Sequence, residues 1–177
     1  VYRNADPSDI VVTAAGGLVG EVAQVWKPKQ INTFETDWGY SCMGYEISGA
    51  LGIKMAKPKQ EVIVFVGDGS YLLNNSDIYS SILYEKKLII VVCDNSGHMV
   101  INRLQLAKGG QEYLCNLKTS RVTNFIEVDF AAHAASMGAE TETVTSTSEL
   151  ESAFLRAKKS NKTYVIALKT HGYEWLE

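Results

Sequence analysis

Several features that would at once assign a chain to a function class are scarce in this sequence. No apolar run approaches the roughly 18 residues that a membrane-spanning helix requires, so no membrane span is expected. Neither charge dominates: 17 basic residues face 20 acidic ones and the net charge is -3, which gives no electrostatic reason to expect nucleic acid or an acidic membrane as a partner. The three cysteines, Cys42, Cys93 and Cys115, lack the spacing of metal ligands. An odd number of cysteines without a secretory signal indicates reduced thiols, as in the cytoplasm.

What is present is the composition of one ordinary globular domain. A chain of 177 residues with 46% apolar residues can bury a substantial core. Residues 1–6 contain neither an initiating methionine nor the apolar centre of a signal peptide. We therefore expect a single domain over residues 1–177 that is cut from a longer cytoplasmic protein.

Strand-like and helix-like segments alternate along the chain. Strands are expected at residues 10–14, 31–34, 62–66, 88–93, 141–144 and 163–169. Helices are expected at residues 19–26, 42–57, 74–86, 129–137 and 148–159, with Asp129 and a Ser148–Glu151 capping box at two of their starts. Residues 96–124 lack clean periodicity and are expected to form a lid. The alternation predicts an α/β fold, a three-layer, doubly wound, mostly parallel sheet.

Two short motifs follow two of the expected strands. Gly67-Asp68-Gly69-Ser70 ends the strand at 62–66, and Asp94-Asn95-Ser96-Gly97 ends the strand at 88–93. The segment between them has room for one helix and one strand, so both motifs should lie at the carboxyl edge of one sheet, where open α/β sheets bind ligands. Oxygen donors suit Mg2+ or Ca2+, and glycines let backbone N–H groups approach phosphate. Either motif alone would be read as a turn.

This pair of motifs resembles the fingerprint of the thiamine-diphosphate-dependent enzymes, with Asp94 at the position of that fingerprint's first asparagine. The resemblance implies that Asp68, the Asn95 side chain and the Gly97 carbonyl bind the Mg2+ (or Ca2+) of a metal–diphosphate. It also implies that Gly67, Gly69 and Ser70 contact the cofactor, thiamine diphosphate, through its phosphates. The chain would then be the diphosphate-binding domain of such an enzyme.

A second cluster, Ser41-Cys42-Met43-Gly44, matches the segment that lies under the cofactor in this superfamily. The resemblance implies that Met43 supports the bent cofactor and that the Ser41 carbonyl accepts a hydrogen bond from the pyrimidine amine. Met43 could instead be a core methionine. Gly16 and Gly17 end the first strand, where the family touches the diphosphate, although a plain turn explains them equally well.

Two residues near the second motif bear on the chemistry. His98 follows Gly97 and is a candidate acid, base or substrate contact, or else an exposed loop histidine. Several decarboxylases of the superfamily have a catalytic glutamate where this chain has Ile101, which argues against a simple pyruvate-decarboxylase-like enzyme. His133, among alanines on an expected helix, is expected to be structural.

Longer strings resemble one group, the trihydroxycyclohexane-1,2-dione hydrolases of myo-inositol catabolism. They are residues 12–18, 40–46, 67–72 and 101–105. The resemblance implies ring-opening hydrolysis of the carbon–carbon bond of a cyclic 1,2-dione to 5-deoxyglucuronate. It also implies a homo-oligomer in which a pyrimidine-binding domain, absent from this chain, supplies an activating glutamate. The isolated chain should then bind metal–diphosphate weakly and show no turnover.

Three alternatives remain at this point. An acetolactate-synthase-like carboligase or a 2-oxo-acid decarboxylase would share every cofactor residue. A non-catalytic subunit with the same fold would lack the activating glutamate. A nicotinamide-binding domain is disfavoured, because no GxGxxG motif follows the first strand.

Overall fold

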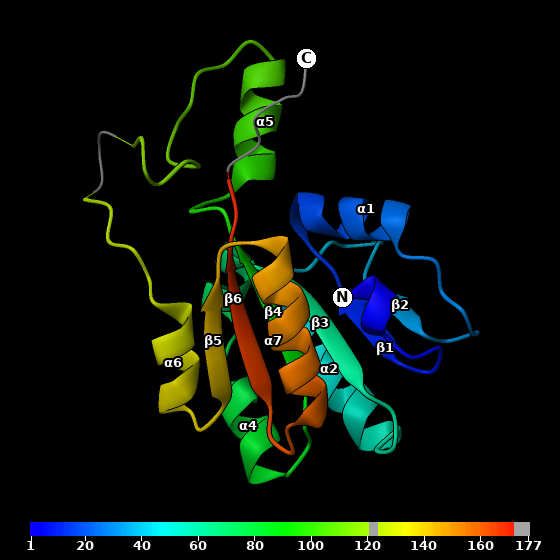
Figure 1. Ribbon diagram of the computed structural model, residues 1–177. Helices are drawn as coiled ribbons and strands as arrows, with labels where there is room; N and C mark the ends of the chain where they lie inside the picture. Colours follow the sequence, from blue (N-terminus) through cyan, green and yellow to red (C-terminus); the bar gives the residue numbers. More distant parts are fainter. Residues whose placement is uncertain (121–123, 172–177) are drawn as a thin grey trace.

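A six-stranded sheet forms the centre of the computed structural model, which describes residues 1–120 and 124–171 (Figure 1). Its strands are β1 (Ile10–Thr13), β2 (Phe34–Thr36), β3 (Val62–Gly67), β4 (Ile89–Asp94), β5 (Glu140–Val144) and β6 (Tyr164–Lys169). They follow the order β2-β1-β3-β4-β6-β5, and every pairing is parallel. The expected parallel α/β sheet is therefore confirmed.

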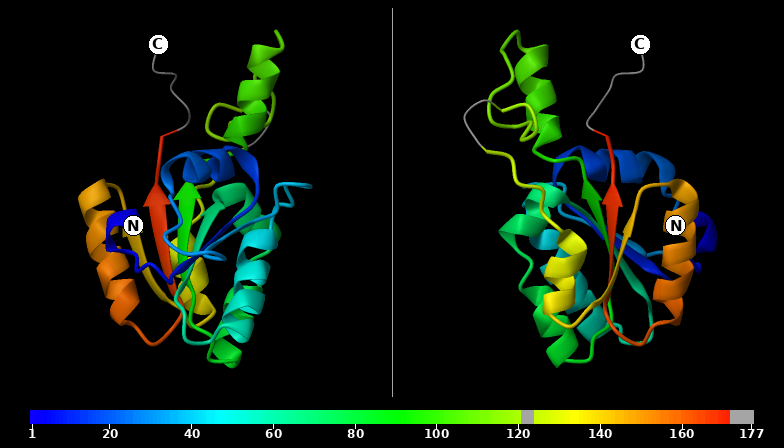
Figure 2. Two further views of the ribbon diagram at one scale, coloured as in Figure 1. Left: turned by 90° about the vertical axis from the view of Figure 1, so that its right-hand side faces the viewer. Right: turned by 60° about the vertical axis from the view of Figure 1, so that its left-hand side comes forward.

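Helices cover both faces of this sheet. They are the 3-10 helix Tyr2–Asn4 and the α-helices α1 (Gly16–Val25), α2 (Tyr45–Ala56), α3 (Asp68–Leu73), α4 (Asp77–Leu83), α5 (Met99–Ala107), α6 (Phe130–Ser136) and α7 (Thr147–Lys159). Helices α2, α4 and α6 lie on one face, and α1 and α7 lie on the other (Figures 1 and 2). None of the helices in the described ranges is long and apolar enough to cross a membrane.

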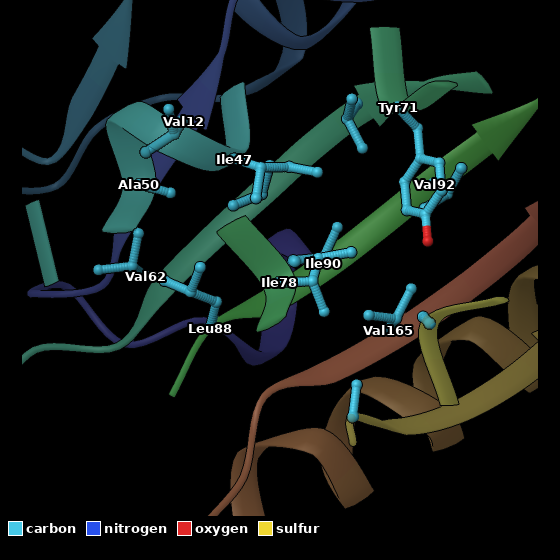
Figure 3. Packing of buried hydrophobic residues seen from close by; sticks show 14 of the residues in the cluster. Val12, Ile47, Ala50, Val62, Tyr71, Ile78, Leu88, Ile90, Val92 and Val165 are labelled. Atoms are coloured by element: carbon cyan, nitrogen blue, oxygen red, sulfur yellow. The ribbon is translucent and has the colours of Figure 1, made fainter. Parts of the chain in front are cut away.

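The central strands are apolar along most of their length because both of their faces are buried. Val62, Val64 and Val66 of β3 belong to the core under α2, α4 and α6, which is shown in Figure 3. Ile63 and Phe65 point the other way and pack in the core under α1 and α7. This period of two is what places successive side chains of one strand in two separate cores.

Helix α5 was not expected. Residues 96–124 were predicted to be an irregular lid, but Met99–Ala107 form a helix that stands beyond the carboxyl ends of the strands (Figure 2). Two of its apolar side chains, Ile101 and Leu104, are about half exposed. The helix therefore lacks the regular spacing of buried apolar residues by which a helix is predicted from sequence. Residues 121–123 of the expected lid lie outside the described residues.

Several element starts also differ from the predictions. The helix expected from residue 19 begins at Gly16, whose positive φ of 78° turns the chain out of β1. The strand expected at 31–34 lies later, at Phe34–Thr36. The cap of α7 is Ser146, which accepts the Glu149 N–H, so the Ser148–Glu151 capping box is wrong. Two nearby serines have the same capping chemistry, and α7 begins at Thr147, one residue before the expected start.

The helix expected over residues 74–86 is shorter, α4 at Asp77–Leu83, and a separate helix, α3, precedes it at Asp68–Leu73. Ser76 is the N-cap of α4 and makes no side-chain cap bond, while Asn74 donates to the Ser48 hydroxyl at 2.7 Å and to the Gly44 carbonyl at 3.2 Å. By contrast, the cap at Asp129 is confirmed, since its carboxylate accepts the Ala132 N–H at 2.9 Å.

Candidate functional site

A cavity of about 640 Å³ opens at the carboxyl ends of β1, β3, β4 and β6. The strand order reverses between β1 and β3, and such switch points are where α/β sheets bind ligands. Every residue predicted from the sequence to touch the cofactor, the metal or the reacting atoms lines it. These residues are Gly16, Gly17, Ser41, Met43, Gly67, Asp68, Gly69, Ser70, Asn95, Gly97 and His98.

The carboxylate of Asp68 joins the two motifs. One of its oxygens accepts the N–H of Gly69 at 2.9 Å, and the other accepts the N–H of Gly97 at 2.8 Å. Its side chain is buried, with 5% of the residue exposed. The end of β3 and the loop after β4 are therefore held together by one acidic group.

Burial also changes the acidity of Asp68. Loss of hydration raises the pKa of this carboxyl to about 6, and the nearby Asp94 adds to the rise, whereas the N–H groups of Gly97 and Gly69 oppose it. Asp94 is itself compensated, because Lys169 lies 2.7 Å from it and the Ser96 N–H donates to it at 3.0 Å. A cation bound at Asp68 would restore the ionised form.

The side chain of Asn95 supplies an independent indication of a ligand. Its Oδ1 atom is buried and has no hydrogen-bond partner, although buried polar atoms are normally paired. Within residues 1–120 and 124–171, no three His, Cys, Asp or Glu side chains group as metal ligands. A divalent ion at Asp68 would therefore need neutral oxygens from the protein and further oxygens from its ligand. This donor set fits a magnesium ion that arrives with a diphosphate.

Gly97 is confined by its surroundings. It has a φ of 154°, and a Cβ atom there would lie 2.1 Å from the carbonyl oxygen of Cys115. The same carbonyl accepts the N–H of His98 at 2.8 Å, and the N–H of Leu117 donates to Ser96 at 3.1 Å. The segment that follows α5 thus packs directly on the motif loop, which leaves no room for a side chain at position 97.

Met43 and His98 meet over Gly69. A Cβ atom on Gly69 would lie 2.6 Å from the His98 ring and 3.3 Å from the Met43 methyl group. Met43 is 39% exposed and lines the cavity, so it is not a core methionine. His98 is exposed on the same cavity, beside the Asp68 motif.

The loop before α2 has a defined conformation. Ser41 has a positive φ of 52°, and the carboxylate of Asp37 accepts the N–H of Cys42 at 3.1 Å. Gly44 also has a positive φ, 92°, and a Cβ atom there would lie 2.7 Å from the Cβ of Asn74. Helix α2 therefore begins at Tyr45 and not at residue 42, which leaves Ser41 and Met43 on a loop that lines the cavity.

Sequence reasoning missed several groups at the site. Thr170 and His171 line the cavity just after β6, and their place at a strand end was the available signal. Cys93 lines it as well, and burial raises the pKa of its thiol to about 12. Glu46 of α2 is 1% exposed and accepts two N–H groups beside the cavity. No local pattern distinguished it from a surface residue.

Comparison with known proteins shows the family to which this chain belongs. Residues 14–168 match the family described as "Thiamine pyrophosphate enzyme, C-terminal TPP binding domain", thiamine pyrophosphate being another name for thiamine diphosphate. The chain belongs to this family. The resemblance seen in the sequence is thereby confirmed, and this TPP-binding domain has its predicted fold.

Curated relatives of this TPP-binding domain include proteins named 3D-(3,5/4)-trihydroxycyclohexane-1,2-dione hydrolase. That of Halalkalibacterium halodurans is 39% identical over 98% of the chain, and that of Listeria monocytogenes serotype 4b is 42% identical over 96%. The chain spans 28% and 26% of their lengths. Among solved structures, the thiamine diphosphate-dependent 4-hydroxybenzoylformate decarboxylase of Rhodococcus jostii RHA1 has a TM-score of 0.84 at 18% identity. The match covers 99% of this chain and 32% of that one, and it supports the fold alone.

Proposed function

We propose that this domain binds thiamine diphosphate with Mg2+ in an enzyme that hydrolyses a carbon–carbon bond of a cyclic 1,2-dione. The substrate would be trihydroxycyclohexane-1,2-dione, opened to 5-deoxyglucuronate in inositol catabolism. The observation that supports cofactor binding is that one cavity is lined both by Asp68 and by Asn95, whose buried oxygen has no hydrogen-bond partner. The names of the relatives support the substrate half.

Each predicted site residue has a task in this proposal. Asp68, Asn95 and the Gly97 carbonyl would hold Mg2+, while Ser70 and the glycines at positions 16, 17, 67 and 69 would line the diphosphate. Met43 supports the cofactor by an apolar contact, and the Ser41 carbonyl accepts a hydrogen bond from its amine. When bound, the cofactor supplies the electron sink that carbon–carbon cleavage requires.

His98 is the candidate for moving a proton near the reacting atoms. It is exposed on the cavity next to Gly69, within the motif that ends β3. Imidazole changes its protonation near neutral pH, which suits an acid or a base. We therefore assign it the proton transfer of the ring-opening step.

An apolar side chain in the cavity argues against a simple pyruvate-decarboxylase-like enzyme. Ile101 lines the cavity at the position where several decarboxylases of the superfamily have a glutamate. A carboligase remains compatible with the same cofactor residues. The choice of substrate therefore depends on the name that these relatives share, and it is tested by comparing the cyclic dione with pyruvate.

We further propose that the working enzyme is a cytoplasmic homo-oligomer. A pyrimidine-binding domain outside these 177 residues would supply the activating glutamate, with 1–177 as one structural domain. The much greater length of the relatives supports additional domains. The chain alone should then bind the cofactor weakly and show no turnover.

The deciding experiment uses the full-length parent protein with thiamine diphosphate, Mg2+ and the cyclic dione. Ring opening is followed in the wild type, in Asp68→Ala and in Glu140→Gln, a control for removing an exposed carboxylate far from the cavity. Turnover that requires the cofactor, disappears in Asp68→Ala and persists in Glu140→Gln is the expected result. Cofactor binding without ring opening would transfer the function to a carboligase or a decarboxylase, tested with pyruvate.

A further inference from the structure

Glu46 is a buried acid that connects two turns of the cavity wall. One carboxylate oxygen accepts the N–H of Ala15 at 3.1 Å, and the other accepts the N–H of Gly44 at 2.9 Å. Ala15 precedes the Gly16–Gly17 turn at the start of α1, and Gly44 follows Met43 at the start of α2. A single side chain thus spans the segments on which two parts of the predicted cofactor site lie.

The environment of Glu46 is unusual for a residue that serves stability alone. Only 1% of it is exposed, and none of the ion pairs found in the described part of the chain includes it. Its charge is balanced by the two N–H groups and by its place in the first turn of α2. Burying a carboxylate without a cation costs more than burying an apolar side chain of similar size.

The two hydrogen bonds act on different elements. Ala15 and Glu46 are 31 residues apart, whereas Gly44 and Glu46 are neighbours in one turn. The bond from Gly44 fixes the carboxylate relative to the Met43 turn. The bond from Ala15 then connects the Gly16 turn to that carboxylate. Gly16 and Met43 line the same cavity, so Glu46 bonds to both of the segments that carry these two walls.

We propose that Glu46 is a positioning residue that sets the Gly16–Gly17 turn and the Met43 turn at the spacing that bound thiamine diphosphate requires. This inference rests on the proposed cofactor function and adds a residue that touches neither cofactor nor substrate. Replacing the carboxylate with an amide keeps its shape but leaves one N–H facing an NH2 group, so one of the two turns is released.

The test compares Glu46→Gln and Glu46→Asp with Glu140→Gln, an exposed carboxylate control, in the full-length parent protein. The dissociation constant of Mg2+–thiamine diphosphate is measured by calorimetry. Amide hydrogen exchange is followed at Ala15 and Gly44, and the melting temperature is recorded. Because Glu46→Gln leaves one buried N–H without an acceptor, it should weaken cofactor binding roughly tenfold. Glu46→Asp should weaken it too, because the shorter side chain cannot span both N–H groups. Exchange should accelerate at Ala15 or Gly44 and remain unchanged in the control.

The outcomes separate this inference from the proposed function. Faster exchange or a lower melting temperature with unchanged cofactor affinity would show that Glu46 is only structural. Failure of both variants to fold would equally count against a local positioning role. A wild type that binds the cofactor without opening the dione would refute the proposed reaction, while the affinities would still decide the role of Glu46. A wild type that binds no cofactor would refute both.

Discussion

Replacing Asp68 with asparagine should change how the stability of the metal-free chain depends on pH. The Asp68 carboxyl has its pKa raised from 3.8 to about 6, chiefly by burial. The folded state therefore holds this proton more tightly than the unfolded state does. Stability from this group is fully present below the unfolded pKa and is lost as the pH rises through the folded pKa.

The magnitude follows from the two pKa values. A rise of about two pH units corresponds to about 3 kcal/mol when the loss is complete, since one unit is worth about 1.4 kcal/mol. Of this, roughly 1.3 kcal/mol is lost between about pH 5 and about pH 7. Asp68 is almost fully buried, so solvent screening should reduce this value little.

Urea unfolding of the metal-free chain with a chelator, at several pH values across this window, measures the effect. The wild type should lose stability relative to Asp68→Asn by about 1.3 kcal/mol from pH 5 to pH 7. The asparagine also leaves one N–H of Gly69 or Gly97 badly paired, but that cost does not vary with pH. Parallel pH profiles for the two proteins would refute the assigned burial effect.

Three further substitutions test the surroundings of the site. Gly97→Ala should destabilise the chain by about 1–3 kcal/mol and abolish cofactor binding, because the new methyl group collides with the Cys115 carbonyl. Thermal melting and cofactor titration measure these effects, and an unchanged melting temperature would contradict the prediction. Tyr71→Phe should cost about 1 kcal/mol in urea unfolding, because the Tyr71 hydroxyl lies 2.9 Å from His133 Nδ1; a neutral result would mean that water replaces the hydroxyl. Glu112→Gln should speed limited proteolysis of the loop after α5, because the Glu112 carboxylate accepts three side-chain hydrogen bonds from that region. Equal cleavage rates in the two proteins would show that these bonds do not hold the loop in place.

The sheet and the site motifs could be predicted from the sequence because their signals are local. Residues 62–66 of β3 and 89–93 of β4 are apolar at every position, which is typical of strands buried on both faces. Asp68 and Asn95 each follow such a strand, and parallel topology alone brings strand ends together. Their placement in one cavity therefore needed no knowledge of tertiary contacts.

The parts that could not be predicted depend on contacts between distant residues. Helix α5 buries few apolar side chains, and Asn102 on it is tied to Glu112 in the following loop. Glu46 looks like an ordinary polar residue of a helix until its contact with Ala15 is seen. His133 was expected to be structural, and its bond to the buried Tyr71 agrees with that expectation.

The hydrogen bonds between the loop before α5 and the segment after it have a consequence for how this fold can diversify. The N–H of His98 donates to the Cys115 carbonyl, and the N–H of Leu117 donates to the Ser96 carbonyl. The segment from His98 to Cys115, an excursion from the sheet, therefore begins and ends at one point of the sheet edge. Closing a loop between fixed ends costs only about 0.6 kcal/mol more for each doubling of its length. Insertions, deletions and new side chains can therefore accumulate in this excursion without shifting Asp68 or β4. Specificity can drift during evolution while the phosphate-binding chemistry is inherited unchanged.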